Sequence, residues 1–572
     1  MKKKYLITTI VILGFGLLFG ALNYNKISEF ITYRIKTTKY VQKAQGELKD
    51  VFFEKVNLGK DAEGVYSTLT IGPDNNLYAA SIDGIINSYS IENDGNLKLN
   101  NSYEIFGKNK KLLIGLHFDP NANENNLIAW ITYSDSPNVE KGPAWNGRLA
   151  RIKLNPNSSL VLENKLILTN LPRSGSDHLT NSIDFGKDGL LYISQGSNTA
   201  NGLANHSPQW LNRSESLLSG AILTFDKSKL PSKLPLDTKT IDGGGVYDPF
   251  AEDAPLTIYA TGVRNAYDIV WHSNGKLFAT LNGSSSGEIT PTSNKNSPLY
   301  IKPNPNYNYT GPNNIPSINK VEPSQNDYLA SIKKGRYYGH PNPLRAEYIL
   351  NHGDSDVDNK EYNGIKPDPN FDEYVYNFGK HSSSNGIIEY KSTVFNGKLI
   401  GSLIITRLAS YYNDIIILKP DSKGNIIDDY DGKDIGLNKM LYPLDLIANQ
   451  NTGDIYVSEY GNQKITLFRP KLKKASNNNI LSDNESDLNS EKSVVLNGEA
   501  IYQRNCKICH GPDGKGATGP NLTDNEWIYG NSQNEIIRII KNGNKNGSMP
   551  AWGNTLNDNE IKKVALFILK LK

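Results

Sequence analysis

The residues with the clearest chemistry are the only two cysteines of this 572-residue chain, Cys506 and Cys509, which stand in the segment CKICH at residues 506–510. A CxxCH spacing attaches a c-type heme, with two thioether bonds to the porphyrin and His510 as an iron ligand. A redox dithiol needs a surrounding βαβ pattern, and a zinc site needs further ligands nearby. Neither accompanies this pair, so the segment predicts covalent heme.

The second axial ligand can be sought among the three methionines, one of which is Met1. Met549 lies in the loop GSMPAWG, where Pro550 stiffens the backbone that must present the sulfur. Methionine is more often a core filler than a ligand, but this one stands among Gly, Asn and Pro rather than on an apolar helical face. The sequence therefore predicts Met549 as the second iron ligand. His/Met coordination raises the reduction potential and suits a center that accepts electrons from an organic donor.

Short helical segments flank the heme motif at residues 498–504, 534–540 and 559–571, the last with apolar residues at helical spacing. The segments CKICHGPDGKG, GPNLTDNEWIYG and SMPAWGNTL resemble the class I cytochrome c domains that are fused to bacterial oxidoreductases or belong to respiratory oxidase subunits. This resemblance implies a small all-α cytochrome c domain at residues 494–572.

The opposite end of the chain indicates where the heme is attached. Lys2, Lys3 and Lys4 precede an uncharged, mostly apolar run at residues 6–22. The run is longer than the core of a typical cleavable signal, and no clean cleavage site follows it. We expect an uncleaved membrane anchor at residues 1–24 and a juxtamembrane segment at residues 25–54, with a cleaved signal as the alternative. Covalent heme attachment requires export, so the body is expected on the periplasmic, extracytoplasmic side.

The central region, residues 55–470, is built from a recurring unit in which a Gly, Asn or Asp turn precedes an apolar strand. The alternating aliphatic and aromatic residues of each unit are typical of a β-hairpin. Six units begin at Ile71, His117, Asp184, Trp271, Phe395 and Asn449. Radial repetition of this kind favours a mainly β fold, a six-bladed β-propeller, while a pair of sandwiches stays open. The polar stretch at residues 471–493 is expected to be a flexible linker to the heme domain.

Two dipeptides immediately precede strand units and could meet at one channel. Asp177 and His178 come before the third unit, and Arg264 and Asn265 come before the fourth. A histidine can serve as a general base and an arginine as a fixed cation. Taken singly, such dipeptides are more often turn or strand-edge residues than catalysts.

The combination of these segments resembles the glucose/sorbosone dehydrogenase family, whose six-bladed propellers use pyrroloquinoline quinone (PQQ). The similar segments are DH followed by FGKDGLLY, TGVRNAYD followed by NGKLF, and GRYYGHPNP. The resemblance implies that His178 takes a proton from a substrate hydroxyl while hydride passes to the quinone. It also implies that Arg264 polarises the quinone oxygen and that Asn265 contacts the cofactor.

Three positions depart from the family pattern. Ser197 stands where an Asp commonly supports the catalytic histidine, and Tyr442 to Asp445 replace a stretch with two arginines that bind quinone carboxylates. The lysine expected after the fifth unit is also missing, although Arg407 lies close enough to substitute for it. Either cations such as Arg407 and Lys380 bind the cofactor in place of the missing groups, or the cofactor site has been remodelled.

Other candidate residues are weaker. His340 is expected to be a structural turn residue, whereas His381 opens the fifth unit and could line the channel. Acidic residues at 354–358 could bind calcium but lack the glycine of a helix-loop-helix calcium loop, so a solvated loop is expected there.

Together these features predict a membrane-anchored quinoprotein dehydrogenase that oxidises a sugar or polyol hydroxyl. Its cofactors would be heme c and PQQ, with calcium as a further candidate, and its partner would be a downstream cytochrome or oxidase. The formal net charge of +3 is too small to imply nucleic acid. The alternative is a non-catalytic propeller that binds a partner or glycan and positions the cytochrome c for electron transfer.

Overall fold

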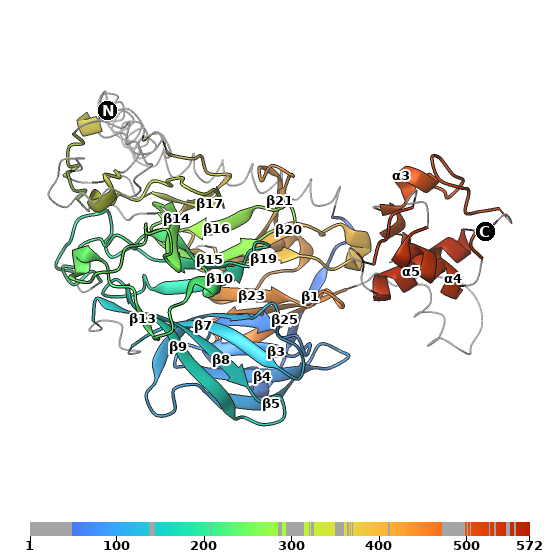
Figure 1. The fold of residues 1–572 in the computed structure, drawn as a ribbon, viewed down its shortest axis with the longest axis horizontal. Coiled ribbons are helices and arrows are strands. Elements are labelled where there is room, and N and C mark those ends of the chain that lie inside the picture. Colours follow the sequence, from blue (N-terminus) through green and yellow to red (C-terminus); the bar gives the residue numbers. More distant parts are fainter. Residues whose placement is uncertain are drawn as a thin grey trace, which may run out of the picture. The chain divides into compact units, whose positions relative to one another are not determined.

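Six sheets form the larger of the two units into which the chain divides, and each has four antiparallel strands, to which the second sheet adds a short parallel fifth (Figure 1). The computed structural model describes residues 48–471 and 498–571 apart from internal gaps, of which the longest are 293–313 and 349–359. The first three sheets contain β2 (Tyr66–Ile71), β3 (Leu77–Ser81), β4 (Ile85–Ile91) and β5 (Leu97–Glu104); β6 (Lys111–Phe118), β7 (Leu127–Asp135), β8 (Trp145–Leu154) and β9 (Val161–Pro172), with the short β13 (Leu236–Asp237) beside β9; and β10 (Thr180–Phe185), β11 (Leu191–Gln195), β12 (Ala221–Phe225) and β14 (Leu256–Thr261). The next three contain β15 (Ala266–Trp271), β16 (Leu277–Leu281), β17 (Asn326–Ile332) and β18 (Tyr376–Lys380); β19 (Ser384–Tyr390), β20 (Ser402–Arg407), β21 (Asp414–Pro420) and β22 (Ile426–Asp431); and β23 (Pro443–Ala448), β24 (Ile455–Glu459), β25 (Lys464–Pro470) and β1 (Phe53–Asn57).

The sheets are arranged as a closed ring. The first strand of each sheet contacts the first strand of the next, in the order β2, β6, β10, β15, β19, β23 and back to β2. Such a ring of inner strands is the architecture of a six-bladed propeller. The propeller prediction is therefore confirmed, and the sandwich alternative is wrong.

Each predicted unit corresponds to the hairpin between the first two strands of one blade. In the third blade, Asp188 accepts a hydrogen bond from the Tyr192 hydroxyl at 2.8 Å, and Gly189 adopts a φ of 78°. In the first blade, the Tyr78 hydroxyl donates to Asp74 at 2.8 Å in the same way. The turn residues that define the repeat in the sequence thus fix the register of the inner hairpins.

The N-terminal strand closes the ring. Strand β1 pairs antiparallel with β25, with Phe53 opposite Pro470, so the sixth blade takes its outer strand from the other end of the propeller (Figure 1). The Phe53 side chain is fully buried and packs edge-on against Tyr390 of the fifth blade, with ring centroids 6.4 Å apart. Closure by an N-terminal strand leaves the ring without an open seam.

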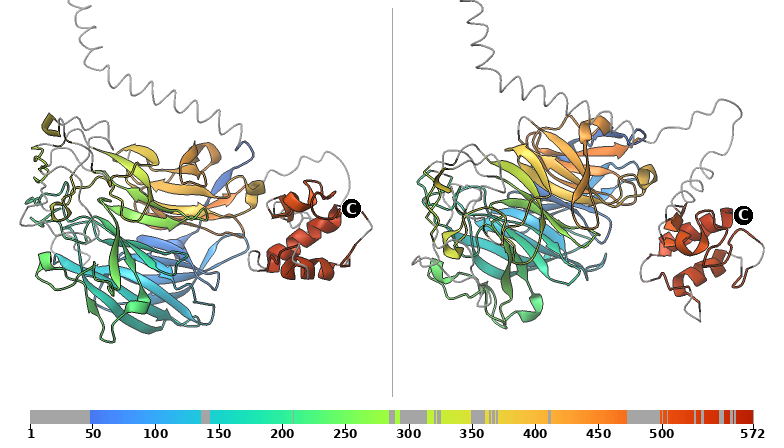
Figure 2. Two further views of the ribbon diagram at one scale, coloured as in Figure 1. Left: turned by 45° about the horizontal axis from the view of Figure 1, so that its top comes forward. Right: turned by 90° about the horizontal axis from the view of Figure 1, so that it is seen from above.

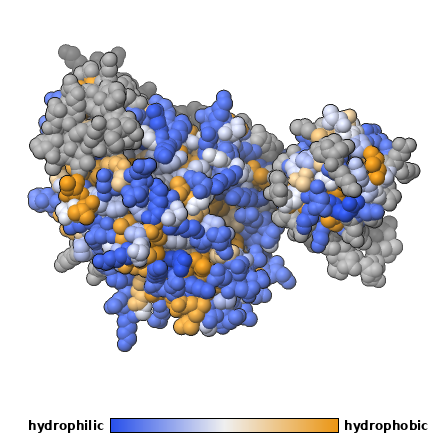
Figure 3. Space-filling view, viewed as in Figure 1, coloured by the Kyte–Doolittle hydropathy of each residue, from blue (hydrophilic) through white to orange (hydrophobic). Residues whose placement is uncertain are grey.

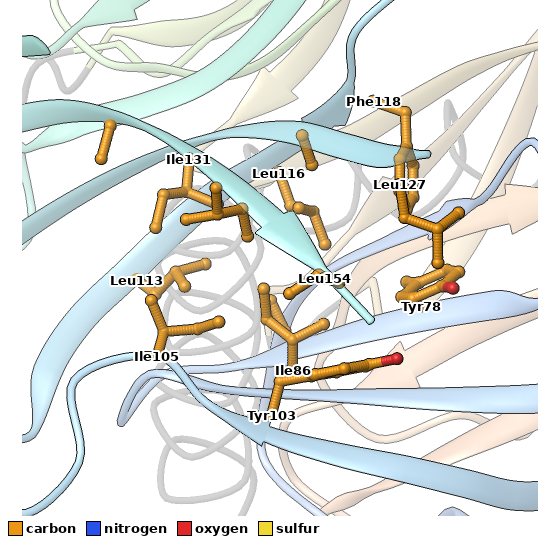
Figure 4. Close-up of a cluster of buried hydrophobic side chains, with 14 of the residues drawn as sticks. Tyr78, Ile86, Tyr103, Ile105, Leu113, Leu116, Phe118, Leu127, Ile131 and Leu154 are labelled. Carbon is orange, nitrogen blue, oxygen red and sulfur yellow. The ribbon is translucent and has the colours of Figure 1, made fainter. Parts of the chain in front are cut away.

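The core lies between the blades. Figure 4 shows one such layer, in which side chains of the first blade, such as Ile86 and Tyr103, face Leu113, Ile131 and Leu154 of the second. Full burial of one such aliphatic side chain contributes about 1.5–3 kcal/mol, so each layer holds its two blades firmly together. On the face drawn in Figure 3, hydrophilic residues predominate and hydrophobic ones are scattered.

The C-terminal unit is helical. Helix α3 (Lys507–His510) carries the heme motif, and α4 (Gln533–Asn542) packs on α5 (Asp558–Lys570), as the red helices of Figure 2 show. Apolar residues of α4 and α5, including Ile536, Val564 and Ile568, form its core. Helices therefore form where the apolar spacing predicted them.

Three predicted segments lie largely outside the described residues: the anchor at 1–24, the juxtamembrane segment at 25–54 and the linker at 471–493. In the part of the chain that is described, no helix is both long enough and apolar enough to cross a bilayer.

Candidate functional site

The two predicted dipeptides meet because they enter adjacent blades from the same end. His178 lies two residues before β10, and Arg264 and Asn265 directly precede β15, the next inner strand of the ring. The backbone N–H of Ser197 donates to the Arg264 carbonyl at 2.6 Å. The Asn181 amide donates to Asn265 Oδ1 at 2.8 Å. The structure therefore brings His178, Arg264 and Asn265 into one cluster.

His178 is held on three sides. The residue is 3% exposed, and its backbone N–H donates to Ser174 Oγ at 3.1 Å. Its Nδ1 lies 2.9 Å from Ser197 Oγ, and its ring packs edge-on against Trp210 with centroids 4.9 Å apart. A Cβ on Gly196 would come within 2.8 Å of the His178 Cβ, so only glycine fits beside the histidine.

Arg264 is oriented by backbone carbonyls. Its Nε donates to the Ala200 carbonyl and its Nη1 to the Gly283 carbonyl, both at 3.0 Å. Its guanidinium also lies 5.7 Å from the centroid of Trp210, within range of a cation–π contact. The φ of Arg264 is 29°, a region that non-glycine residues rarely adopt and that is typically held by surrounding contacts at functional sites.

A pocket opens beside Arg264. Its wall includes Asn282, Gln325, Tyr328, Tyr374 and His340. Tyr328 and Tyr374 stack face to face with ring centroids 3.9 Å apart. Amide groups and aromatic faces next to a fixed cation provide hydrogen bonds and stacking surface for a small polyhydroxylated molecule.

The electrostatics keep the candidate base neutral. Burial lowers the pKa of His178 to about 3, the positive charge of Arg264 acts in the same direction, and Asp177 opposes both. A neutral imidazole can accept a proton, whereas an imidazolium cannot. His178 is therefore in the form that a general base requires.

A buried carboxylate supports this cluster from the connection between β11 and β12. Glu215 Oε1 accepts from His340 Nε2 at 2.9 Å and from the Thr199 backbone N–H at 3.0 Å. Burial alone would raise the pKa of Glu215, but hydrogen bonds from His340, Ser219 and Thr199 bring it down to about 2. Burial also holds the pKa of His340 below its ordinary value, against the opposing effect of Glu215.

Sequence analysis missed Trp210 and Glu215, which no local motif distinguishes. The expectation for His340 was a structural turn residue, and its side chain is in fact buried against Glu215 and belongs to the pocket wall. Its partner stands 125 residues away in the sequence, so only the fold reveals the pair.

Two further predicted residues lie in the fifth blade. Arg407 donates from Nε and Nη2 to the two carboxylate oxygens of Asp414, at 2.8 and 2.9 Å, and its guanidinium lies 4.4 Å from the Tyr412 ring centroid. His381 is exposed, with a φ of 42°, and burial around its ring lowers its pKa while Asp327 opposes this. Cofactor binding by Arg407 stays a prediction.

PQQ is a planar quinone with three carboxylates. The cluster of His178, Arg264 and Asn265 suits the quinone carbonyls better than it suits the carboxylates. His178, Arg264 and Asn265 provide a base, a cation and an amide in one place. The carboxylates would need cations, yet Arg407 is already paired with Asp414, and Asp445 is a buried acceptor for the Leu69 N–H at 2.7 Å.

Calcium stays a prediction. Within the described residues, no three His, Cys, Asp or Glu side chains are grouped so that they could hold a metal ion. The acidic residues at 354–358 lie outside that part of the chain.

The heme motif has the arrangement that covalent attachment needs. Cys506 and Cys509 form no disulfide; Cys506 is the N-cap residue of α3, and Cys509 lies within it. His510 Nδ1 lies 2.9 Å from the Pro520 carbonyl, which can only accept, so Nδ1 carries the proton and Nε2 is left for iron. Met549 belongs to the same apolar cluster as Cys506 and Trp527. These residues fit a heme with His/Met ligation.

Family comparisons agree with both halves of this picture. Residues 66–294 match the Glucose / Sorbosone dehydrogenase family. This match spans the first three blades and the first two strands of the fourth. Residues 494–568 match the family of cytochrome c oxidase, cbb3-type, subunit III, so a cytochrome c domain follows the propeller.

Individual relatives cover parts of the chain. The cytochrome domain is similar to the cbb3-type cytochrome c oxidase subunit FixP of Bradyrhizobium diazoefficiens, with 42% identity over 77 residues that make up 13% of this chain and 26% of the relative. It is also similar to subunit CcoP of Rubrivivax gelatinosus, with 40% identity over 86 residues, 15% of this chain and 28% of the relative. The chain thus spans about a quarter of the length of these curated relatives.

Solved structures resemble the propeller region. The PQQ-bound aldose sugar dehydrogenase of Streptomyces coelicolor has 15% identity and a TM-score of 0.44, with 73% of this chain and 98% of that chain covered. The PQQ domain of pyranose dehydrogenase from Coprinopsis cinerea has 11% identity and a TM-score of 0.45, with 73% and 97% covered. Values this low support no inference about ligand or activity.

Proposed function

We propose that this protein is a PQQ-dependent dehydrogenase that oxidises a hydroxyl group of a sugar or polyol and passes the electrons to its own heme c. The observation that carries the proposal is the meeting of His178, Arg264 and Asn265 at one end of two adjacent inner strands, in a propeller of the glucose/sorbosone dehydrogenase family. The same chain carries a cytochrome c domain, in which His510 and Met549 would ligate the heme iron and give the electrons an exit.

His178 is the general base of this reaction. Its neutral, buried imidazole accepts the proton of the substrate hydroxyl while the carbon-bound hydrogen leaves as hydride. PQQ, when bound, would supply the two-electron acceptor for that hydride and allow the electrons to pass singly to the heme. Arg264 and Asn265 would hold the acceptor carbonyl, and the Arg264 charge would stabilise negative charge that develops there.

The pocket beside Arg264 supports a polyhydroxylated substrate. Stacked Tyr328 and Tyr374 offer an aromatic wall, and Asn282 and Gln325 offer amide groups. Which sugar or polyol binds depends on how many of these groups its hydroxyls reach.

The decisive experiment follows the heme absorption bands of the purified protein after loading with PQQ and calcium and addition of aldoses and polyols. We expect substrate-dependent heme reduction and a fall in its rate of about 10²–10⁴-fold in His178→Asn, the usual contribution of a general base. His206→Gln, an exposed histidine in the same β11–β12 connection, is the matched control and should leave the rate unchanged. A heme that no substrate reduces, or an unaffected His178→Asn, contradicts the proposal.

A non-catalytic propeller that positions the cytochrome c is the second candidate. The bidentate pairing of Arg407 with Asp414 favours it, because this pairing occupies a cation that quinone carboxylates would need. Quenching of tryptophan fluorescence on addition of PQQ, compared with Trp210→Phe to isolate Trp210 among the six tryptophans, separates the two candidates, since Trp210 contacts both His178 and Arg264. Saturable quenching supports the dehydrogenase, and its absence supports the second candidate.

We also propose that residues 1–24 anchor the protein in the membrane with its body on the extracytoplasmic side, where a downstream cytochrome or oxidase accepts its electrons. The apolar run at residues 6–22 and the need for export before heme attachment support this location. Alkaline extraction of membranes tests it, because an anchored protein stays in the pellet and a cleaved one is released.

A further inference from the structure

The hydrogen bonds around Ser197 determine which nitrogen of His178 carries the proton. Ser197 Oγ lies 2.8 Å from the Thr199 carbonyl and 2.9 Å from His178 Nδ1. A hydroxyl has one proton, and a carbonyl oxygen can only accept. The Ser197 proton therefore goes to Thr199, and the bond to His178 forms only if Nδ1 is the donor.

We infer that Ser197 is a positioning residue that fixes His178 as the Nδ1–H tautomer, which leaves the lone pair on Nε2, and that it does so without adding a negative charge. The tautomer follows from the geometry alone, whereas its role in catalysis rests on the proposed function. A carboxylate at this position would hold the same tautomer but would also favour the imidazolium.

Ser197 is itself rigidly held. It is fully buried, and its backbone N–H donates to the Arg264 carbonyl at 2.6 Å. Its acceptor, Thr199, is fixed by two hydrogen bonds to Glu215, from the backbone N–H at 3.0 Å and from Oγ1 at 2.5 Å. The chain from Glu215 through Thr199 to Ser197 therefore sets the direction of the Ser197 hydroxyl.

Four charged or titratable groups act on His178 from the elements packed around it. Arg264, before β15, and His340, between β17 and β18, disfavour the imidazolium, whereas Asp177, before β10, and Glu215, between β11 and β12, favour it. Burial of the His178 ring also disfavours the imidazolium, in the same direction as Arg264 and His340. With a neutral hydroxyl as its direct partner, His178 should stay unprotonated, and competent as a base, in mildly acidic solution.

The test is the nitrogen NMR spectrum of the full protein with ¹⁵N-labelled histidine, recorded without PQQ. The His178 signals are assigned by their loss in His178→Asn. We expect a protonated Nδ1 and an unprotonated Nε2, unchanged between pH 8 and pH 5. A protonated Nε2, or an imidazolium at pH 6, overturns the inference without the need for any further variant.

Variants at position 197 give the second readout. Ser197→Ala should mix the two tautomers, and Ser197→Asp should keep the Nδ1 proton but move the titration of His178 to higher pH. Ser207→Ala, in the same connection, is the control and should leave the His178 signals in place. An unchanged spectrum in Ser197→Ala contradicts the inference.

Turnover separates the tautomer from the proposed function. In active holoenzyme, the acid limb of the rate profile should move to higher pH in Ser197→Asp, with the rate falling about tenfold per pH unit below the new pKa. Should the holoenzyme be inactive, the dehydrogenase proposal fails while the NMR result still decides the tautomer.

Discussion

At the scale of single residues, the site depends on one buried carboxylate. Glu215 is enclosed in the protein, yet donors from His340, Thr199 and Ser219 converge on its two oxygens. A buried carboxylate with this many hydrogen bonds remains ionised, whereas one without them would become protonated. Its charge therefore depends entirely on the folded arrangement around it.

The pKa of Glu215 predicts a loss of stability in acid. Because its folded pKa of about 2 lies below the ordinary value of 4.5, its contribution is complete above pH 4.5 and is lost as the pH falls toward 2. The contribution is about 3 kcal/mol. In urea unfolding at several pH values, Glu215→Gln should lower stability at pH 7 and flatten this acid slope. Glu163→Gln, at a half-exposed ion pair with Arg151, should leave the slope as in wild type.

A second residue-scale prediction concerns the heme. Met549→Leu keeps an apolar side chain in the cluster but removes the sulfur, so the low-spin His/Met spectrum should be lost. The reduction potential of the heme should decrease, by an amount inside the range of about 0.8 V over which axial ligands tune it. Met440→Leu, at a buried propeller methionine, is the control. An unchanged spectrum in Met549→Leu would place the ligand elsewhere.

At the scale of elements, the β11–β12 connection carries much of the site. It provides Ser197, Trp210 and Glu215, and the segment after β17 clamps it from the side. Arg345 of that segment is 2% exposed and donates from Nη1 to the Leu217 carbonyl at 2.7 Å and to the Ser219 carbonyl at 3.1 Å. The geometry around His178 thus depends on contacts between the third and fourth blades.

Removal of the Arg345 side chain should lower the free energy of unfolding. Arg345→Met leaves the two carbonyls and the buried Glu347, which accepts from Arg345 Nε at 2.9 Å, without this partner. We expect a loss of about 3–5 kcal/mol in the free energy of unfolding. Arg336→Met, at a more exposed pair with Asp372, should cost about 1 kcal/mol or less. Equal effects in the two variants would argue against the clamp.

Elements also show what a sequence can and cannot reveal. The heme motif and the six turn units are local patterns, since two thiols or one hairpin turn lie within a few residues, and their structures were predictable. Dipeptides such as those of His178 and Arg264 required the family resemblance. The pair of Glu215 with His340 joins loops of two different blades, and no sequence pattern near either residue predicts its partner. Buried polar pairs of this kind depend on the fold as a whole.

At the scale of the molecule, the propeller is a ring whose stability depends on its seam. Strand β1 gives only a short segment to the sixth blade, yet Phe53 is fully buried and Lys55 pairs with Glu459 at 3.1 Å. The seam therefore combines apolar burial with an ion pair between chain segments that are 404 residues apart.

Weakening of the seam should unfold the whole ring. Phe53→Ala should lower the free energy of unfolding by about 3–5 kcal/mol in a single cooperative step, because the fully buried Phe53 ring packs on Tyr390 of the fifth blade across the seam. Phe52→Ala is the adjacent control, since Phe52 is 46% exposed and should change stability little. A loss confined to the sixth blade, seen as a separate early transition, would contradict the cooperative ring.

The pairing of β1 with β25 also orders events during biosynthesis. The first strand of the propeller must wait, with its edge unpaired, until the last has been made, and contacts so distant in sequence form slowly. The heme motif follows β25 in the chain, so it is made after the strand that completes the ring. Ring closure and heme attachment therefore depend on successive parts of the chain, and a chain cut short before β25 has neither a finished propeller nor a heme.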